Sequence, residues 1–439
     1  SYLAQLYFLD TCGFHQFCSY WYNGFTAFLI TPPGWYFFTY PLYLLFGDVK
    51  IAAYASIILI LVLSYVVIHY FGKKLKIQPL YRILFFLLVF ANVNSIRSFL
   101  RSGRPHELLG WFLFLLLFFI VLYYKDKKIT LPFYTTTLVY SALILTYFSV
   151  AIYGGLLFLG LFLYKKTKEK IQVIFAVLVG ILLSSFWLVP FLTNIKETFI
   201  ETFYAGQWLL EFTKLAMFKQ LGATIFPLIF LVLFYISWKE QHKNKRYFLF
   251  YSPFLTLAVL LFFRITAFLP IFKNIPPTQY FTLFIVLAAY LLITLKSLHK
   301  LLLYALGLAA IGSVVITLFF TAYYEVQNQD TQDILELLPH IEERYMAIGL
   351  SPKEVYSKPL TAYAAIYYDL DNALGWYPHV KEQSYFEEID KLQKAFNEQN
   401  CEEIIEQLEV LNTQEVLTHI GCSFLTKCGL DLKAEKHDY

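Results

Sequence analysis

Long apolar segments recur through the first three quarters of the chain, and each is close to the length that crosses a membrane. A bilayer core of about 30 Å takes roughly 20 apolar residues in helical form. A helix satisfies its own backbone hydrogen bonds in lipid, whereas an open sheet does not. The segments therefore predict an all-α polytopic transmembrane bundle with ten visible spans: residues 50–71, 79–98, 107–124, 131–147, 149–164, 170–191, 221–238, 247–263, 279–295 and 300–322.

Lysine and arginine gather in alternate connections between these segments. The stretches "GKKLK", "KDKK", "KKTKEK", "KEQHKNKR" and "KSLHK" follow the first, third, fifth, seventh and ninth spans. Short loops rich in Lys and Arg stay on the cytoplasmic side. We expect these five loops to be cytoplasmic in the plasma membrane, and the intervening loops to face outward.

Residues 1–49 contain another apolar stretch, "PPGWYFFTYPLYLLFGD". Counting it as a crossing would move all five basic loops to the outer side. Its aromatic residues and the internal Pro41 are typical of a helix that lies in the membrane interface. We expect residues 1–49 to be an outer loop with an interfacial helix. The chain begins without methionine, and we expect a further span to precede residue 1.

The last part of the chain has a different composition. Residues 323–439 contain 22 acidic and 9 basic side chains, and the apolar runs stop there. We expect a membrane domain at 50–322, followed by a small, acidic, extracytoplasmic domain of mixed α/β structure. Within it, "TQDILELLPHIEERYMAI" has helical spacing, and "EVLTHIGCSFL" reads as a strand or a pair of strands.

The five cysteines all fall in regions expected to face outward. Cys12 and Cys18 share a spacing with Cys422 and Cys428, so each pair can close a small loop in an oxidising compartment, with Cys401 left over. The alternative is that all five are free thiols.

Three arginines crowd the connection between the second and third predicted spans, which the topology places outside. Arg97, Arg101 and Arg104 precede His106 and Glu107 in this short stretch. One interpretation is that they cap a span and meet lipid headgroups. The other is that they hold an anion, because the planar guanidinium matches a phosphate. A lipid phosphate is the anion at that depth.

Asp10 and His15 lie in the first outer loop and are the candidate catalytic residues. Glycosyl transfer from a sugar phosphate needs a carboxylate to deprotonate the acceptor and cations to stabilise the departing phosphate. Asp10 as base and the arginines as phosphate ligands meet this requirement, although a lone loop carboxylate is as often a solvated turn residue. The cofactor stays open. A divalent metal ion is one alternative, but one Asp and one His do not define a metal site.

The first loop resembles that of GT-C-fold glycosyltransferases, which use polyprenyl-phosphate sugars. The resemblance covers roughly the first 125 residues and implies a GT-C-like fold, with Trp21 and Tyr36 among the substrate-binding residues. "SGRPHELLGWFLF" is similar to a stretch in bacterial and archaeal membrane proteins related to 6-pyruvoyl-tetrahydropterin synthase. Many GT-C members carry two acids in the first loop, whereas here Asp10 stands alone until Asp48. The matching positions are Asp10, His15, Trp21, Gly24, Pro32, Pro33, Tyr36, Pro41, Gly47 and Asp48.

We therefore expect an inverting membrane glycosyltransferase of the cell envelope. Its expected partners are a polyprenyl-phosphate-linked sugar, a lipid, glycan or protein acceptor, and membrane lipids. The alternatives are a scramblase or flippase for lipid-linked sugars, or a non-catalytic membrane scaffold. Nucleic acid is not an expected partner, because the basic residues are explained as cytoplasmic loop anchors.

Overall fold

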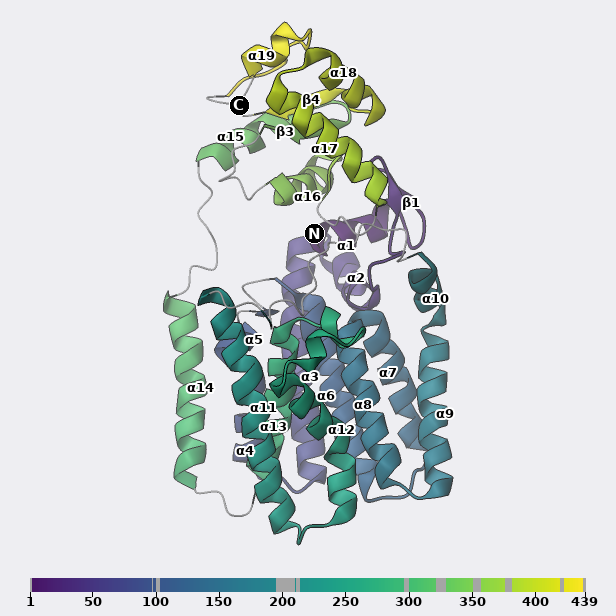
Figure 1. Cartoon of the computed structure of the whole chain (residues 1–439), viewed down its shortest axis with the longest axis vertical. Helices are drawn as coiled ribbons and strands as arrows, with labels where there is room; N and C mark the ends of the chain where they lie inside the picture. The colour runs from purple at the N-terminus through teal and green to yellow at the C-terminus, as the bar shows by residue number, and fades with distance from the viewer. Residues whose placement is uncertain are drawn as a thin grey trace.

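The computed structural model describes residues 2–96, 98–99, 103–194, 210, 214–295, 300–320, 329–349, 357–375, 381–418 and 422–436. A helical bundle forms one end of the molecule, and a smaller unit made by the C-terminal residues forms the other (Figure 1). The N-terminal segment lies between the two, beneath the C-terminal unit.

The bundle is made of helices from most of the chain's length: α3 (Val49–Lys74), α4 (Pro79–Phe90), α5 (Val93–Ile96), α6 (Pro105–Lys125), α7 (Thr135–Thr146), α8 (Phe148–Tyr164), α9 (Thr167–Leu183), α10 (Ser185–Asn194), α11 (Lys214–Glu240), α12 (Lys245–Phe262), α13 (Pro277–Thr294) and α14 (Lys300–Phe320), with 3₁₀ turns η2 (Leu131–Tyr134), η4 (Ile265–Ala267) and η5 (Phe272–Asn274). The central helices are α6 and α13. In their apolar 18-residue stretches 83% and 78% of the residues are buried, against 33% in α3.

Local sequence signals explain where several of these helices begin. Pro105 and Pro277 begin α6 and α13, where a missing N–H costs nothing, and Asp48 caps α3 by accepting from the backbone of Lys50 and Ile51.

Each of the ten predicted spans contains an apolar helix, but these helices differ in length. Within the described ranges, five are long and apolar enough to cross a membrane: α3, α6, the Ala223–Glu240 part of α11, α12 and α13. A sixth crossing results if α9 and α10, bent by 69°, form one span. In the remaining predicted spans the described apolar helices are shorter (Pro79–Phe90, Leu131–Thr146, Phe148–Tyr164 and the Tyr304–Ile316 part of α14), so the total of ten stays a prediction.

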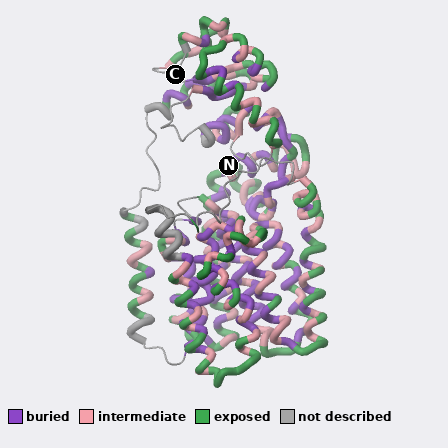
Figure 2. Tube along the Cα trace, in the orientation of Figure 1, coloured by how far each residue is buried: buried purple, intermediate pink, exposed green. Residues whose placement is uncertain are grey.

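The outer surface of the bundle is apolar. Large hydrophobic side chains such as Ile58, Leu182 and Val232 are more than half exposed. Figure 2 shows exposed residues running along the outside of the bundle and buried residues along its interior. A water-soluble bundle would place polar side chains outside, so this surface fits hydrocarbon.

Small residues allow close helix packing. A Cβ built on Gly160 of α8 would lie 2.2 Å from the carbonyl oxygen of Phe250 in α12. A Cβ on Gly34 would lie 2.2 Å from Thr146 Oγ1 at the end of α7. Glycine therefore lets backbones meet where any side chain would separate them.

The N-terminal segment consists of α1 (Tyr2–Thr11), a short antiparallel hairpin of β1 (Phe17–Cys18) and β2 (Phe25–Thr26), and α2 (Gly34–Phe46). A disulfide joins Cys12 to Cys18, as the first of the two predicted pairs requires. The helix expected in the "PPGWYFFTYPLYLLFGD" stretch is α2, which contains Pro41 and ends at Gly47 with a left-handed φ of 68°. Its position in a membrane interface stays a prediction.

The C-terminal unit contains α15 (Gln329–Leu337), η6 (Leu338–His340), β3 (Tyr345–Ile348), α16 (Ser357–Tyr368), α17 (Gln383–Glu398), α18 (Cys401–Val410), β4 (Glu415–Thr418) and α19 (Cys422–Lys427). Strands β3 and β4 pair in parallel. Met346 and Ile348 of β3 pack against Leu392, Phe396 and Ile404 of α17 and α18.

The predicted Cys422–Cys428 disulfide is wrong, because Cys428 bonds to Cys401. Cys422 begins α19, and Cys428 follows the end of that helix. Six helical residues rise by about 9 Å, which is beyond the reach of a disulfide. The helix that intervenes between the two cysteines therefore determines the pairing.

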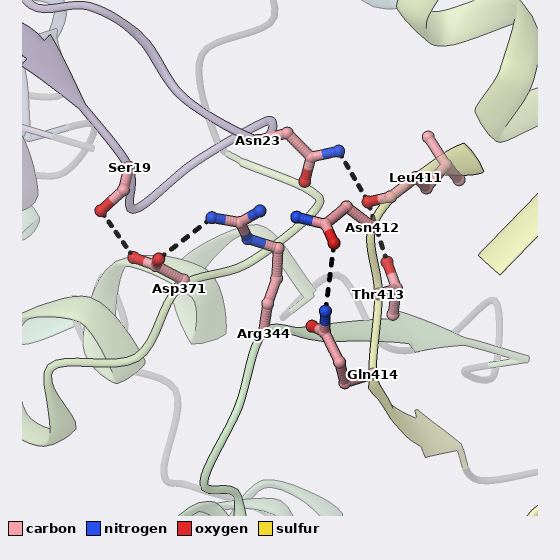
Figure 3. Close-up of polar contacts among 8 residues, drawn as sticks. All are labelled: Ser19, Asn23, Arg344, Asp371, Leu411, Asn412, Thr413 and Gln414. Carbon is pink, nitrogen blue, oxygen red and sulfur yellow. Dashed lines mark hydrogen bonds and ion pairs between the residues drawn. The ribbon is translucent and has the colours of Figure 1, made fainter. Parts of the chain in front are cut away.

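Segments from opposite ends of the sequence form a polar junction (Figure 3). Ser19 donates to Asp371 Oδ1 at 3.0 Å, and Arg344 donates to the other oxygen at 3.2 Å. The amide of Asn23 donates to the carbonyl of Leu411 at 2.6 Å. These contacts hold the C-terminal unit against the first loop, at the end of the bundle where that loop lies.

Candidate functional site

Asp10 lies in the last turn of α1 and is exposed. The hydroxyl of Tyr40 in α2 donates to Asp10 Oδ1 at 2.8 Å. This hydrogen bond raises the pKa of Tyr40, with smaller contributions from burial and from the Asp10 charge. Tyr40 therefore remains a neutral donor that orients the carboxylate.

A second carboxylate, Asp369, comes to the same place from the C-terminal unit. Its backbone adopts a left-handed φ of 57°, and it accepts hydrogen bonds from the hydroxyls of Tyr7 (3.4 Å) and Tyr20. The pKa of Tyr7 is raised, chiefly by burial and also by the charges of Asp369 and Asp10. Tyr7 thus lies within the field of two carboxylates that are far apart in sequence. We call this set the tyrosine–carboxylate site: Tyr7, Asp10, Tyr20, Tyr40 and Asp369.

Lysine and further tyrosines extend the site along α3 and α16. The Lys50 ammonium lies 4.6 Å from the ring centroid of Tyr367 and 5.7 Å from that of Tyr363. Aromatic faces, carboxylates and a cation side by side are the groups that bind sugar rings and their hydroxyls.

His15 packs against an aromatic side chain of the first loop. It has a left-handed φ of 56°, and its ring stacks on Phe14 with centroids 4.0 Å apart. Burial lowers its pKa, although a backbone hydrogen bond with Phe28 acts in the opposite direction. Across the described ranges, no group of three or more His, Cys, Asp or Glu side chains is arranged to hold a metal ion.

Trp21 and Tyr36 are buried in the core, at 0% and 1% exposure. The Trp21 ring N–H donates to the carbonyl of Thr361 at 3.4 Å, and the Tyr36 hydroxyl donates to Gln5 Oε1 at 2.8 Å. In this conformation both rings hold the first loop in place. Contact with a sugar through either ring would require this packing to open.

Of the three arginines in the connection before α6, the structure describes one. Arg97 and Arg101 lie outside the described residues. Arg104 directly precedes α6, and its guanidinium is 3.6 Å from Glu107 Oε2. The Arg104 side chain is 43% exposed and that of Glu107 is 0% exposed, so the arginine faces out from a buried carboxylate.

His106 links α6 to α1 and to the residue between α7 and α8. Its Nε2 is 3.3 Å from the hydroxyl of Tyr2, and its ring meets Tyr147 edge to face at 4.9 Å. The Tyr147 hydroxyl in turn accepts a hydrogen bond from the amide of Gln279 on α13. A chain of polar groups therefore crosses this end of the bundle.

Among the residues that the structure describes here, several buried polar atoms have no hydrogen-bond partner: Tyr153 Oη, Gln279 Oε1 and His106 Nδ1. Buried polar atoms are normally paired, and intramembrane ionisable groups usually mark a functional site. A polar ligand or water that enters here would satisfy them. We call this set the buried polar cluster: Tyr2, Arg104, His106, Glu107, Trp111, Tyr147, Tyr153 and Gln279.

Helix α1 connects the two sites. Tyr2 at its start contacts the buried polar cluster, and Asp10 near its end belongs to the tyrosine–carboxylate site. Eight helical residues separate them by about 12 Å along the axis. The sequence singles out Asp10, Arg104, His106 and Glu107 as candidates, and a stretch that includes Asp369, "DLDN", resembles a calcium loop without the EF-hand spacing. It carries no local signal for Tyr7, Tyr147 or Gln279.

Apolar helices with an apolar outer surface, and a polar cluster at one end, define an integral membrane protein. A family model for the 6-pyruvoyl-tetrahydropterin synthase related domain, described as a membrane protein, matches residues 32–326, and the chain belongs to this family. The match spans the bundle helices and the Arg104–Glu107 stretch, whereas Asp10 and Asp369 lie on either side of it. No curated protein matches the chain.

Proposed function

We propose that the protein is a GT-C-type glycosyltransferase, which moves a sugar from a polyprenyl-phosphate donor to an acceptor on the outer face of the membrane. The acceptor is a lipid, a glycan or a protein. The proposal rests on one observation above all: α1 joins an exposed, tyrosine-oriented carboxylate to a buried polar cluster beside Arg104.

The separation of the two sites suits a donor that lies between membrane and water. Along α1 about 12 Å lies between Tyr2 and Asp10, which leaves room for a sugar phosphate. Arg104 has a long, partly exposed side chain at the membrane end and carries the charge that a phosphate needs. The polyprenyl chain would then follow the apolar outer surface of the bundle.

The reaction needs one proton transfer. Asp10 takes the proton from the acceptor hydroxyl, and that oxygen forms a bond to the anomeric carbon. The bond from this carbon to the phosphate oxygen breaks, and polyprenyl phosphate leaves with the electron pair. Attack opposite the leaving group inverts the anomeric configuration, and the arginine charge stabilises the departing phosphate.

The test compares two Asp→Asn variants of the full chain in detergent. Polyprenyl-phosphate hexoses and pentoses, labelled in the sugar, are supplied with membrane extract as acceptor, and release of polyprenyl phosphate is measured. Asp10→Asn should lower the rate at least ~100-fold, the range of general-base catalysis. Asp390→Asn, an exposed carboxylate on α17, should leave the rate unchanged.

Retention of activity by Asp10→Asn would reject the proposed base. If the wild type releases no polyprenyl phosphate but both variants move the labelled lipid across the bilayer of vesicles, a scramblase is the better account. If the protein shows neither sugar transfer nor lipid transport, a non-catalytic scaffold is the better account.

A further inference from the structure

The far end of the bundle, opposite the C-terminal unit, has an apolar groove on its outer surface. The groove lies between α8 and α9 and has a volume of about 310 Å³. Gly155, Phe158 and Phe162 line it from α8 at helical spacing, and Ile174 and Leu178 line it from α9. All of its lining residues are apolar, and Leu178 is 59% exposed.

Basic residues surround one end of this groove. The Lys170 ammonium lies 4.9 Å from the ring centroid of Phe162, which itself lines the groove. Lys166, just before α9, and Lys168, in its first turn, are both exposed. The apolar groove therefore ends at a cluster of lysines. We call Lys166, Lys168 and Lys170 the cationic collar.

The acidic residue beside this collar is already neutralised. Glu169 pairs with the buried Lys165 at 3.1 Å and accepts from the backbone N–H of Ile129 at 3.2 Å. Lys165 also donates to the carbonyl of Lys127. These contacts fix the α8–α9 and α6–η2 connections together and leave Lys166, Lys168 and Lys170 as excess positive charge.

We infer that the α8–α9 groove binds an anionic glycerophospholipid, with an acyl chain along Gly155–Phe162 and the headgroup phosphate against Lys170 and its neighbours. The apolar lining excludes polar ligands, and the cationic collar selects a negative headgroup over a zwitterionic one. The first-turn amides of the 17-residue helix α9 add to the positive field at the same point. This lipid site is separate from the tyrosine–carboxylate site and the buried polar cluster.

Native mass spectrometry of the full chain in detergent tests the inference, with dioleoyl phosphatidylglycerol and dioleoyl phosphatidylcholine as probes. Phosphatidylglycerol should bind the wild type more tightly by about fivefold or more, since a lysine near an anionic surface has an effect of that size. Lys170→Gln should reduce that preference by about fivefold, the effect of one lysine. Lys239→Gln, an exposed lysine on α11, should leave it unchanged.

Filling the groove provides a second, independent variant. A Cβ on Gly155 meets only the Tyr140 hydroxyl, at 3.4 Å, so Gly155→Leu fills the groove with little displacement. It should weaken binding of both lipids, whereas Gly312→Leu on α14, where a Cβ meets nothing within 4 Å, should not. Equal binding of the two lipids by the wild type, or variants that match their controls, would overturn the inference. Polyprenyl phosphate that displaces phosphatidylglycerol at lower concentration would also overturn it.

Discussion

The two acidic side chains Glu107 and Asp10 differ in how strongly their surroundings constrain them, because one is buried and the other is exposed. Glu107 is wholly buried in the first turn of α6 with Arg104 as its ion-pair partner, whereas Asp10 is exposed and held by one tyrosine. A buried charge must keep its partner, but an exposed one is free to react. The two acids therefore suit different tasks, and substitutions at them should have different effects.

Removing Arg104 should destabilise the protein more than removing the charge of Glu107. Arg104→Gln leaves a buried carboxylate without its ion-pair partner, and we expect a loss of about 1–3 kcal/mol, because the exposed guanidinium is partly screened by solvent. Thermal unfolding in detergent measures the change. The double variant Arg104→Gln/Glu107→Gln should recover part of the loss, and an additive double variant would show that the two side chains do not interact.

His15 should reduce stability in acid. Burial lowers its pKa from the ordinary 6.5, so below pH 6.5 the unfolded chain binds a proton that the folded chain does not. Stability contributed by neutral His15 is present above pH 6.5 and is lost as the pH falls toward the folded pKa. Melting temperatures of the wild type and His15→Asn, compared between pH 7.5 and 5, should converge or cross as the pH falls. Asparagine tolerates the left-handed backbone at this position, and a constant difference would contradict the prediction.

At the scale of elements, glycine positions determine which helices pack closely. Gly160 brings α8 against the backbone of α12, and Gly34 brings the start of α2 against the end of α7. Neither contact is visible in the apolar pattern, because glycine within an apolar run predicts only a helix. The neighbouring helix gives each glycine its role.

Gly160→Ala should destabilise the bundle, because its Cβ would lie 2.2 Å from the backbone carbonyl oxygen of Phe250, which moves less easily than the end of a side chain. Overpacking of this kind costs about 1–3 kcal/mol. Gly312→Ala provides the matched control in α14, where a Cβ meets nothing within 4 Å. Detergent melting curves should show a lower melting temperature for the first variant alone, and equal curves would mean that α12 shifts without cost.

At the scale of the whole molecule, the first loop and the C-terminal unit act as one body above the bundle. Asn372 forms backbone bridges to both Trp21 and Tyr345, so the loop, this residue and β3 lie side by side. Asp369 and Asp371, which shortly precede Asn372, reach the tyrosine–carboxylate site and the junction respectively. The second carboxylate near Asp10 therefore depends on this docking.

Trp21→Ala should release the C-terminal unit from the first loop. Truncating a buried tryptophan typically costs about 3–5 kcal/mol, and here the lost contacts join two parts of the chain. Limited trypsin digestion should cleave the C-terminal unit faster in this variant. Phe17→Ala, in the same hairpin but 69% exposed, should digest like the wild type. Unchanged digestion of Trp21→Ala would show that the polar junction alone holds the unit.

The sequence by itself determined the helical membrane class, the position of α2 and the composition break before the C-terminal unit. These depend on local apolar content and charge, which act on each segment separately. The helical spacing of the sequence predicted a helix at residues 345–348, and this prediction was wrong. These residues form β3, because pairing with β4 outweighs the local preference. Only the tertiary structure decided the Cys401–Cys428 bond and the approach of Asp369 to Tyr7. Each of these joins residues whose contact depends on the packing of everything between them.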